Sequence, residues 1–302
     1  MPIASSLMEN ALPTPFPAPQ PLPPGLDRTA IAAHPALRAV LKAQAGAFLA
    51  VHRQIPRIAA IFGTQQRYLL AQLATAMAFE RGERGLVVAH FLEAVKEHAI
   101  ASRNTAISFV EEMLHYRMAQ AGPAGADRRS RPVVLAGSTV AALETWLALH
   151  LESLDALDGG SRRATLRRDP GLLAQMHPRI VRQLLSSKTT MQPARILALF
   201  SDMNDGGLLM DKIIASLDDA PAGAERFPTR IRSFGQLSEP LRITRTHLLR
   251  KLAASERAAH VGWSAKRGAS IFWISRDFLT EYEAYQIDKL ACIEAAWQAA
   301  AA

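Results

Sequence analysis

A short residue pattern occurs twice in this chain and limits what each half can form. Residues 102–110 read Ser-Arg-Asn-Thr-Ala-Ile-Ser-Phe-Val, and residues 244–252 read Thr-Arg-Thr-His-Leu-Leu-Arg-Lys-Leu. Each copy opens with a hydroxyl residue suited to cap a helix, continues with an arginine in the first turn, and then places apolar residues at helical spacing. The repeat therefore predicts two helices, each with a polar N-terminal end and an apolar face for packing.

The segments around the two copies share one predicted order: a helix, a short turn, the capped helix, a basic segment flanked by β-forming residues, and a further apolar helix. Short strands are predicted at 132–135, 261–264 and 270–275, and a loop at 218–228. Helices are predicted over 36–50, 64–81, 86–98, 102–118 and 140–157 in the first half, and over 172–187, 193–216, 234–241, 244–256 and 278–298 in the second. For the helix at 193–216, a break at Asn-Asp-Gly-Gly (204–207) is the alternative.

This order predicts a mainly α fold with short β-hairpin wings, built as a tandem winged helix-turn-helix. We expect an intramolecular pseudo-dimer whose inter-module core is formed by the apolar helices at 140–157, 172–185 and 278–297. The expected divisions are a disordered Pro-rich tail (1–26), a first winged-helix domain (27–157), a basic linker rich in Gly and Arg (158–170) and a second winged-helix domain (171–302).

Charge and cysteine content narrow the class of protein and its partners. The net charge of +8 favours a polyanionic partner, and the hydrophobic content of 49 % supports real cores. The single cysteine, Cys292, excludes an intrachain disulfide and fits a reducing compartment. No run approaches about 18 apolar residues, and no secretory signal is evident, so we expect no membrane partner and a cytoplasmic, nucleoid-associated location.

The repeated helices carry side chains suited to DNA. A capped helix N-terminus offers free amides to phosphate. An arginine such as Arg103 or Arg245 can bond guanine twice, and Asn104 can pair with adenine. Each feature alone also fits an ordinary solvated cap or basic loop, and only their coincidence favours double-stranded DNA. The residues predicted to contact DNA are Ser102, Arg103, Asn104, Thr105 and Ser108 on the first helix, Thr244, Arg245, Thr246, His247 and Arg250 on the second, and Arg128, Arg129, Arg131, Lys266 and Arg267 in the wings.

Residues 91–131, and especially Asp-Arg-Arg-Ser-Arg-Pro-Val-Val-Leu at 127–135, resemble the DNA-binding core of MarR-type winged-helix transcription regulators. The resemblance implies that Asp127 braces a wing, that Arg129 or Arg131 reaches DNA, and that residues 102–108 face the major groove. It also implies dimer-forming terminal helices and a small-molecule effector pocket, although the sequence shows no polar cluster that specifies a ligand. The second module has no Asp-x-Arg motif in its wing.

Motifs of enzymes are absent from the sequence, which has no Gly-rich phosphate loop, no His-Glu-x-x-His and no cysteine pair for zinc. Asp202 and Asp205 are interpreted as loop residues and not as a cation site. We therefore expect no enzyme activity, no cofactor and no metal. Glu111 and Glu112, on a helix meant to face DNA, count against DNA binding.

The expected function is sequence-specific transcriptional regulation in a bacterial cytoplasm, with an asymmetric site because the two reading helices differ. Two alternatives stay open: a plasmid-type replication initiator with tandem winged-helix domains, and a protein-interaction module. A homodimer that uses one module per chain is the alternative to the pseudo-dimer.

Overall fold

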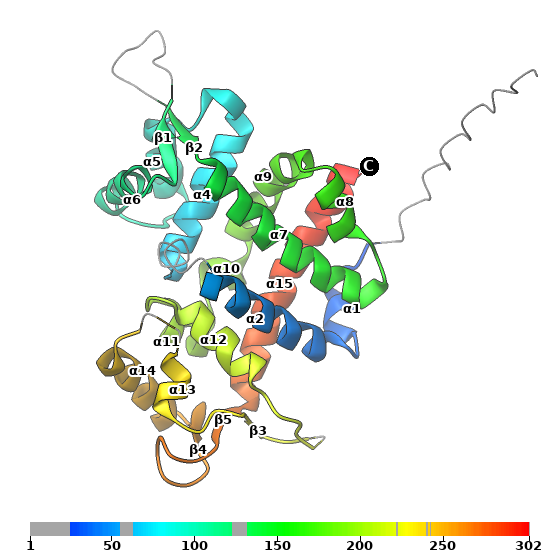
Figure 1. Ribbon diagram of the computed structural model, residues 1–302, viewed down its shortest axis with the longest axis vertical. Helices are drawn as coiled ribbons and strands as arrows, with labels where there is room; N and C mark the ends of the chain where they lie inside the picture. The colour runs from blue at the N-terminus through cyan, green and yellow to red at the C-terminus, as the bar shows by residue number, and fades with distance from the viewer. Residues whose placement is uncertain are drawn as a thin grey trace, which may run out of the picture.

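The computed structural model describes residues 25–54, 63–122, 132–221, 223–239, 241 and 243–301. In these residues the chain is mostly helical with two small antiparallel sheets, as the sequence predicted (Figure 1). The Pro-rich segment expected to be disordered lies outside the described residues, except for its last two positions. Asp127, Arg128, Arg129 and Arg131 also lie outside them.

The first half begins with three helices, α1, α2 and α4. A single bridged residue, Leu86, then precedes two further helices, a β-hairpin and a long helix. Leu86 forms a bridge with Val133, which adds a minimal third strand beside the hairpin. The elements are α1 (Arg28–Ala33), α2 (Leu37–Gln54), α4 (Gln65–Arg81), η1 (Gly82–Arg84), α5 (Val88–Glu97), α6 (Arg103–His115), β1 (Ala119–Ala121), β2 (Val133–Leu135) and α7 (Gly137–Asp158).

The second half repeats this order, with two further short helices, α10 and α11, before α12. Its three-stranded sheet has the order β3-β5-β4, so the strand before the short helix again pairs with the last hairpin strand. The elements are α8 (Arg162–Arg168), α9 (Gly171–Ser186), α10 (Lys188–Met191), α11 (Arg195–Ser201), α12 (Gly206–Ala215), β3 (Arg226–Pro228), α13 (Phe234–Ser238), α14 (Arg245–Arg257), β4 (Val261–Trp263), β5 (Phe272–Ser275) and α15 (Arg276–Ala301).

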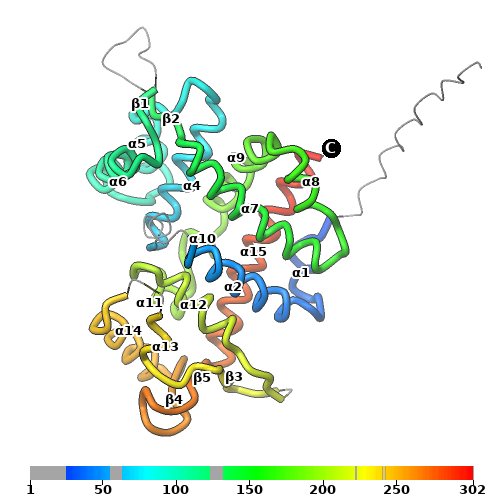
Figure 2. Tube along the Cα trace, viewed as in Figure 1, coloured from blue at the N-terminus to red at the C-terminus, as the bar shows by residue number. Residues whose placement is uncertain are grey.

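One helix of each half packs on the other half. Helix α2 packs on α12 of the second half, and α9 packs on α4 of the first. The remaining contacts also correspond, with α1, α2 and α7 of the first half equivalent to α8, α9 and α15 of the second. Helix α2 packs on α7, and its equivalent α9 packs on α15. Helix α1 packs on α15 of the other half, and its equivalent α8 packs on α7. The long helices α7 and α15 also touch, as the tube in Figure 2 lets the reader follow. The halves are therefore interleaved.

Two apolar cores result from this arrangement. The larger, here called the central core, joins α2, α7, α9, α12 and α15 with the sheet and helices of the second half. The smaller holds α4, α5, α6 and the first hairpin, and α9 adds Val181 and Leu185 to it. The predicted packing of the three helices at 140–157, 172–185 and 278–297 is confirmed, and α2 is a further member that the sequence did not indicate.

Two segments differ from the expected elements. Residues 158–170, expected to be a linker, contain α8. The expected loop at 218–228 ends in β3, a three-residue strand at the sheet edge that pairs with β5, and this pairing rather than local periodicity sets the strand. The helical segment predicted at 193–216 is divided into α11 and α12 at the break considered at 204–207, with Asp205 at a positive φ of 56° between them.

A buried ion cluster joins α7, α8 and α15. Arg162 is 3 % exposed and Glu294 is 2 % exposed. The guanidinium lies 2.8 Å from Glu294 Oε2 through Nε, 2.6 Å from Asp158 Oδ2 through NH2, and 3.2 Å from Asp155 Oδ1 through NH1. Burial of the Asp158 carboxylate is the largest single effect and opposes its charge, but the hydrogen bonds from Arg162 and from the Gly160 amide, together with the charge of Arg162, outweigh burial and lower the pKa of Asp158. Arg162 is thus an internal crosslink and not part of a solvated basic linker.

We expect the folded state to lose stability as the pH falls from about 6.5 to 4, because two core histidines resist protonation. His150 and His177 are each 0 % exposed and pack against Trp146, with ring centroids 4.5 Å and 6.3 Å from its ring. Burial lowers the pKa of His150 to about 3 and that of His177 to about 4. The unfolded chain binds protons below its ordinary histidine pKa while the folded chain does not, so each histidine removes roughly 2 kcal/mol between pH 6.5 and pH 5.

Urea denaturation at several pH values would measure this loss of stability. The variants His150→Phe and His177→Phe should each flatten the slope of unfolding free energy against pH, and the exposed His115→Phe should leave it unchanged. A wild-type slope that survives both core substitutions would contradict the assignment.

Candidate nucleic-acid interface

Helix α6 begins at the predicted cap. Ser102 Oγ accepts a hydrogen bond from the Thr105 amide at 3.2 Å, and Ser102 has the extended backbone of an N-cap. The apolar positions expected to face inward are buried, which seats the helix against α4 and α5. The five positions predicted to contact DNA are all exposed: Ser102, Arg103, Asn104, Thr105 and Ser108.

Helix α14 repeats this geometry. Thr244 Oγ1 accepts from the His247 amide at 3.3 Å, and Leu248 and Leu252 are buried below it. The predicted contact residues Thr244, Arg245, Thr246 and Arg250 are exposed, whereas His247 is half-buried. Both capped helices therefore present polar N-terminal ends to solvent while their apolar faces hold them to the body.

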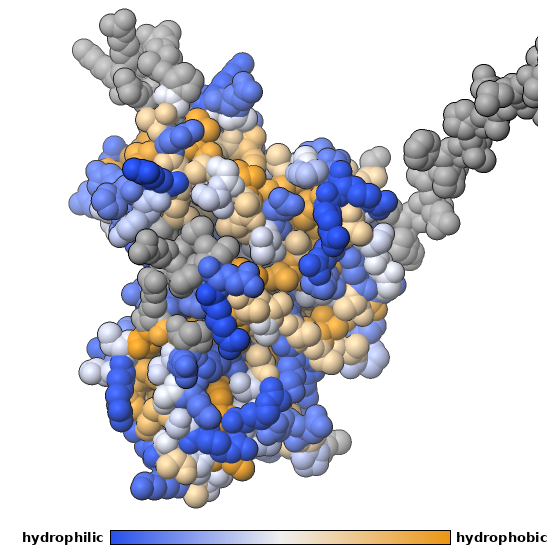
Figure 3. Space-filling model, in the orientation of Figure 1, coloured by the Kyte–Doolittle hydropathy of each residue, from blue (hydrophilic) through white to orange (hydrophobic). Residues whose placement is uncertain are grey.

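The two capped helices lie on the same side of the molecule. In Figure 1, α6 and α14 both lie along the left edge, and the two hairpins lie toward opposite ends. The space-filling view in Figure 3 shows strongly hydrophilic side chains over both places on that edge. One extended ligand lying along this edge could meet both helices.

The second hairpin presents two basic residues at its tip, one of which contacts the neighbouring helices. Lys266 and Arg267 are both exposed at the turn, where Gly268 takes a positive φ of 73°. Arg267 Nε donates to Glu256 Oε2 of α14 at 2.8 Å, and its guanidinium lies 4.9 Å from the centre of the Phe234 ring. Lys266 is thus the more available cation, and Arg267 fixes the hairpin against α13 and α14.

Helix α6 carries two neighbouring glutamates, of which one forms an ion pair and the other is exposed. Glu112 forms an ion pair with Arg67 of α4. Glu111 is exposed on the outer face. The ion pair reduces the repulsion that Glu112 would exert on a polyanionic ligand, whereas the exposed Glu111 carboxylate would still repel such a ligand.

The loop between α11 and α12 does not assemble a cation site. Asp202 lies 2.6 Å from Lys251 Nζ in an ion pair, and Asp205 is buried at the start of α12. Within the described ranges, no group of three or more His, Cys, Asp or Glu side chains is placed to hold a metal ion. In the same ranges no helix has both the length and the apolar content needed to cross a membrane.

One cluster could not be predicted from the sequence, which shows no polar group that specifies a ligand. Lys289 of α15, Asp211 of α12 and Tyr68 of α4 line one cavity between the halves. These residues are far apart in the chain and belong to no motif, so only the interleaved packing brings them together.

No protein-family model, curated protein or solved structure was found to match the chain. The resemblance to MarR-type regulators therefore depends on the quoted residues alone and stays a hypothesis.

Proposed function

We propose that the protein is a sequence-specific regulator of transcription that binds double-stranded DNA through two winged-helix modules in one chain. The observation that carries the proposal is the repeated order of helix, strand, short helix, capped helix and hairpin, with both capped helices exposed on one side. In winged-helix proteins the corresponding capped helix enters the major groove and the hairpin contacts the flanking backbone. The proposed location is the bacterial cytoplasm, on the nucleoid.

The free amides at the two helix N-termini would fix each helix on a phosphate. Arg103 and Arg245, in the first turn of each helix, are then placed to reach base edges. Lys266 would supply a further cation from the hairpin to the backbone or the minor groove.

The two reading surfaces differ, so the proposed site is asymmetric. Asn104 corresponds to Thr246, and Ser108 corresponds to Arg250, in the two copies of the pattern. Asn pairs well with adenine, whereas Arg250 would reach a phosphate or a second base. Since the contacts between halves repeat within one chain, both modules would read a single duplex without a second chain.

We expect Arg103→Ala and Arg245→Ala each to weaken specific binding about 10-fold to 100-fold, because each removes a contact to a base worth roughly 1–3 kcal/mol. The measurement is selection of duplexes from a random pool by wild type and both variants, followed by titration of the selected site at fixed salt. Arg168→Ala is the control, since Arg168 is exposed on α8, away from the edge that carries α6 and α14.

Each outcome of this selection bears on the proposal. An asymmetric motif that loses information at different positions in the two variants supports two modules reading one site. A palindrome points to a homodimer that uses one module per chain, and directly repeated sites favour the replication-initiator hypothesis. Absence of any enriched sequence overturns DNA reading and favours a protein-interaction role.

A further inference from the structure

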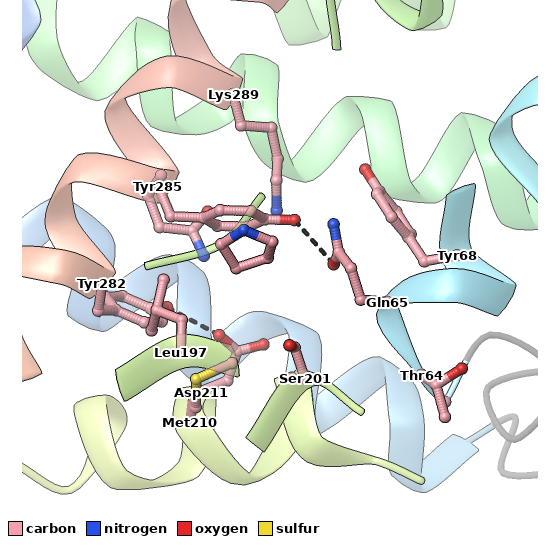
Figure 4. Close-up of a pocket in the computed structure, with 14 residues that line it drawn as sticks. Thr64, Gln65, Tyr68, Leu197, Ser201, Met210, Asp211, Tyr282, Tyr285 and Lys289 are labelled. Atoms are coloured by element: carbon pink, nitrogen blue, oxygen red, sulfur yellow. Dashed lines mark hydrogen bonds between the residues drawn. The ribbon is translucent and has the colours of Figure 1, made fainter. Parts of the chain in front are cut away.

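A chamber lies where α2, α4, α7, α12 and α15 meet. It consists of two adjoining hollows, one mostly polar in its lining residues and one mostly apolar, which share Tyr68, Asp211 and Lys289. The apolar hollow has a volume of ≈ 270 Å³. In Figure 4 the side chains of Lys289, Tyr68 and Gln65 point toward the same space from α15 and α4.

The cation in this chamber has no close counter-ion. Lys289 Nζ lies 4.7 Å from the centre of the Tyr285 ring and 5.8 Å from that of Tyr68. No hydrogen bond or ion pair of Nζ is formed with any described residue. The nearby Asp211 carboxylate is engaged by the Tyr282 hydroxyl at 2.7 Å. Aromatic faces stabilise an ammonium group only in part, so a negative charge placed beside Lys289 would be favourable.

Electrostatics of the same group agree with this geometry. Burial lowers the pKa of Lys289 to about 8, against a smaller opposing effect from the Asp211 carboxylate. At neutral pH the amine is still mostly protonated, because its pKa remains above 7. The fold therefore keeps a partly desolvated positive charge that a bound anion would stabilise.

Two neutral polar groups in the chamber are also unsatisfied. The Tyr68 hydroxyl and Gln72 Oε1 are buried, and neither forms a hydrogen bond of normal geometry with a described residue, although the Gln72 side chain lies close enough to act on the hydroxyl. Gln72 is 4 % exposed. Buried polar atoms rarely lack partners in native proteins. A ligand placed between Lys289 and α4 could accept a hydrogen bond from the Tyr68 hydroxyl.

The other hollow offers an apolar wall. The residues that line it include Trp146, Leu143 and Ala142 of α7, Phe48 of α2 and Leu208 of α12. Such a wall binds a hydrophobic body and leaves few polar atoms to satisfy.

We propose that this chamber binds a small carboxylate with an apolar body, whose carboxylate meets Lys289 and Tyr68 and whose body packs against Trp146. The proposal goes beyond DNA binding and does not depend on it, because the recognition chemistry lies between the helices of the two halves and uses none of the residues proposed to contact DNA.

Calorimetric titration without DNA tests the proposal. The probes are naphthalene-2-carboxylate and octanoate, which offer a flat and a flexible body, and their neutral amides. We expect at least one carboxylate to bind wild type at least about tenfold more tightly than its amide, since the amide lacks the charge that Lys289 attracts.

Variants locate the binding site. Lys289→Met should weaken the carboxylate at least about tenfold and leave the amide unchanged, and Tyr68→Phe should weaken the carboxylate less. Lys266→Met, on the exposed hairpin, is the matched control and should bind as wild type does. The ligand-free Lys289→Met protein should melt no lower than wild type, because it loses a half-buried charge without a close partner.

Three results would overturn the proposal: no binding of either carboxylate at about 1 mM, equal affinity for carboxylate and amide, or full affinity in a folded Lys289→Met protein. None of these results bears on DNA binding, which the duplex selection tests separately.

Discussion

Replacing Arg162 with methionine is expected to lower the free energy of unfolding by about 3–5 kcal/mol. The substitution leaves the Glu294 carboxylate buried without its cation, and it removes the group that Asp155 and Asp158 bond. An uncompensated buried charge costs far more than the loss of a pair at the surface, because the interior does not screen it. The cluster also joins α7 and α8 to α15, so its loss should open the end of the central core.

Chemical denaturation of wild type and Arg162→Met measures the loss. Arg163→Met is the matched control, since Arg163 is the next residue and pairs with Glu152 at the surface, where such a pair contributes about 0–1 kcal/mol. Adding Glu294→Gln to Arg162→Met should restore part of the stability by removing the stranded charge. A loss of the same size in Arg163→Met, or no recovery in the double variant, would contradict this account.

Substitution of Gly206 by alanine is expected to cost at least about 3 kcal/mol. A Cβ at this position would lie 1.8 Å from the Phe200 carbonyl oxygen and 2.7 Å from its carbon, both of which are backbone atoms. The clash lies where α11 gives way to α12, so relief would require moving one helix away from the other. Because α12 packs on α2, that movement would also disturb the contact between the halves.

The adjacent glycine provides the control. A Cβ at Gly207 meets nothing within 4 Å, so Gly207→Ala should be neutral or should stabilise α12 by up to about 1 kcal/mol. Thermal melting of both variants separates the clash from the general effect of replacing glycine in a helix. Similar melting temperatures for the two variants would show that the backbone at Phe200 yields easily.

Much of the helical structure could be predicted because local signals mark it. The caps Thr64, Ser102 and Thr244 each accept a backbone hydrogen bond as their residue types suggest, and the apolar spacing of α6 matches its buried face. The strand β3 could not be predicted, since three residues carry no periodicity and their partner β5 lies far along the chain. Helix α8 was not predicted because the two glycines just before it, Gly159 and Gly160, are typical of a loop and led the arginine-rich residues after them to be assigned to the same linker.

The candidate interface was partly predictable for the same reason. Exposure of Arg103 and Arg245 follows from their place one residue after a cap. Two ion pairs, Arg267 with Glu256 and Glu112 with Arg67, depend on how the helices pack. The charge pattern of the sequence therefore could not show that Arg267 and Glu112 are already paired within the protein. The chamber around Lys289 depends on contacts between segments more than 70 residues apart, for which one sequence holds no signal.

The exchange of helices between the halves also affects the order in which the protein can be assembled during synthesis. Helix α15 packs on α1, α2, α7, α9 and α11, and all of these precede it in the chain. Until residues 276–301 leave the ribosome, the apolar faces of those helices have no complete partner, and contacts of such long sequence separation form slowly. Nascent chains should therefore remain open to chaperones until translation has passed α15, whereas the smaller core around α4, α5 and α6 can close once α9 has emerged.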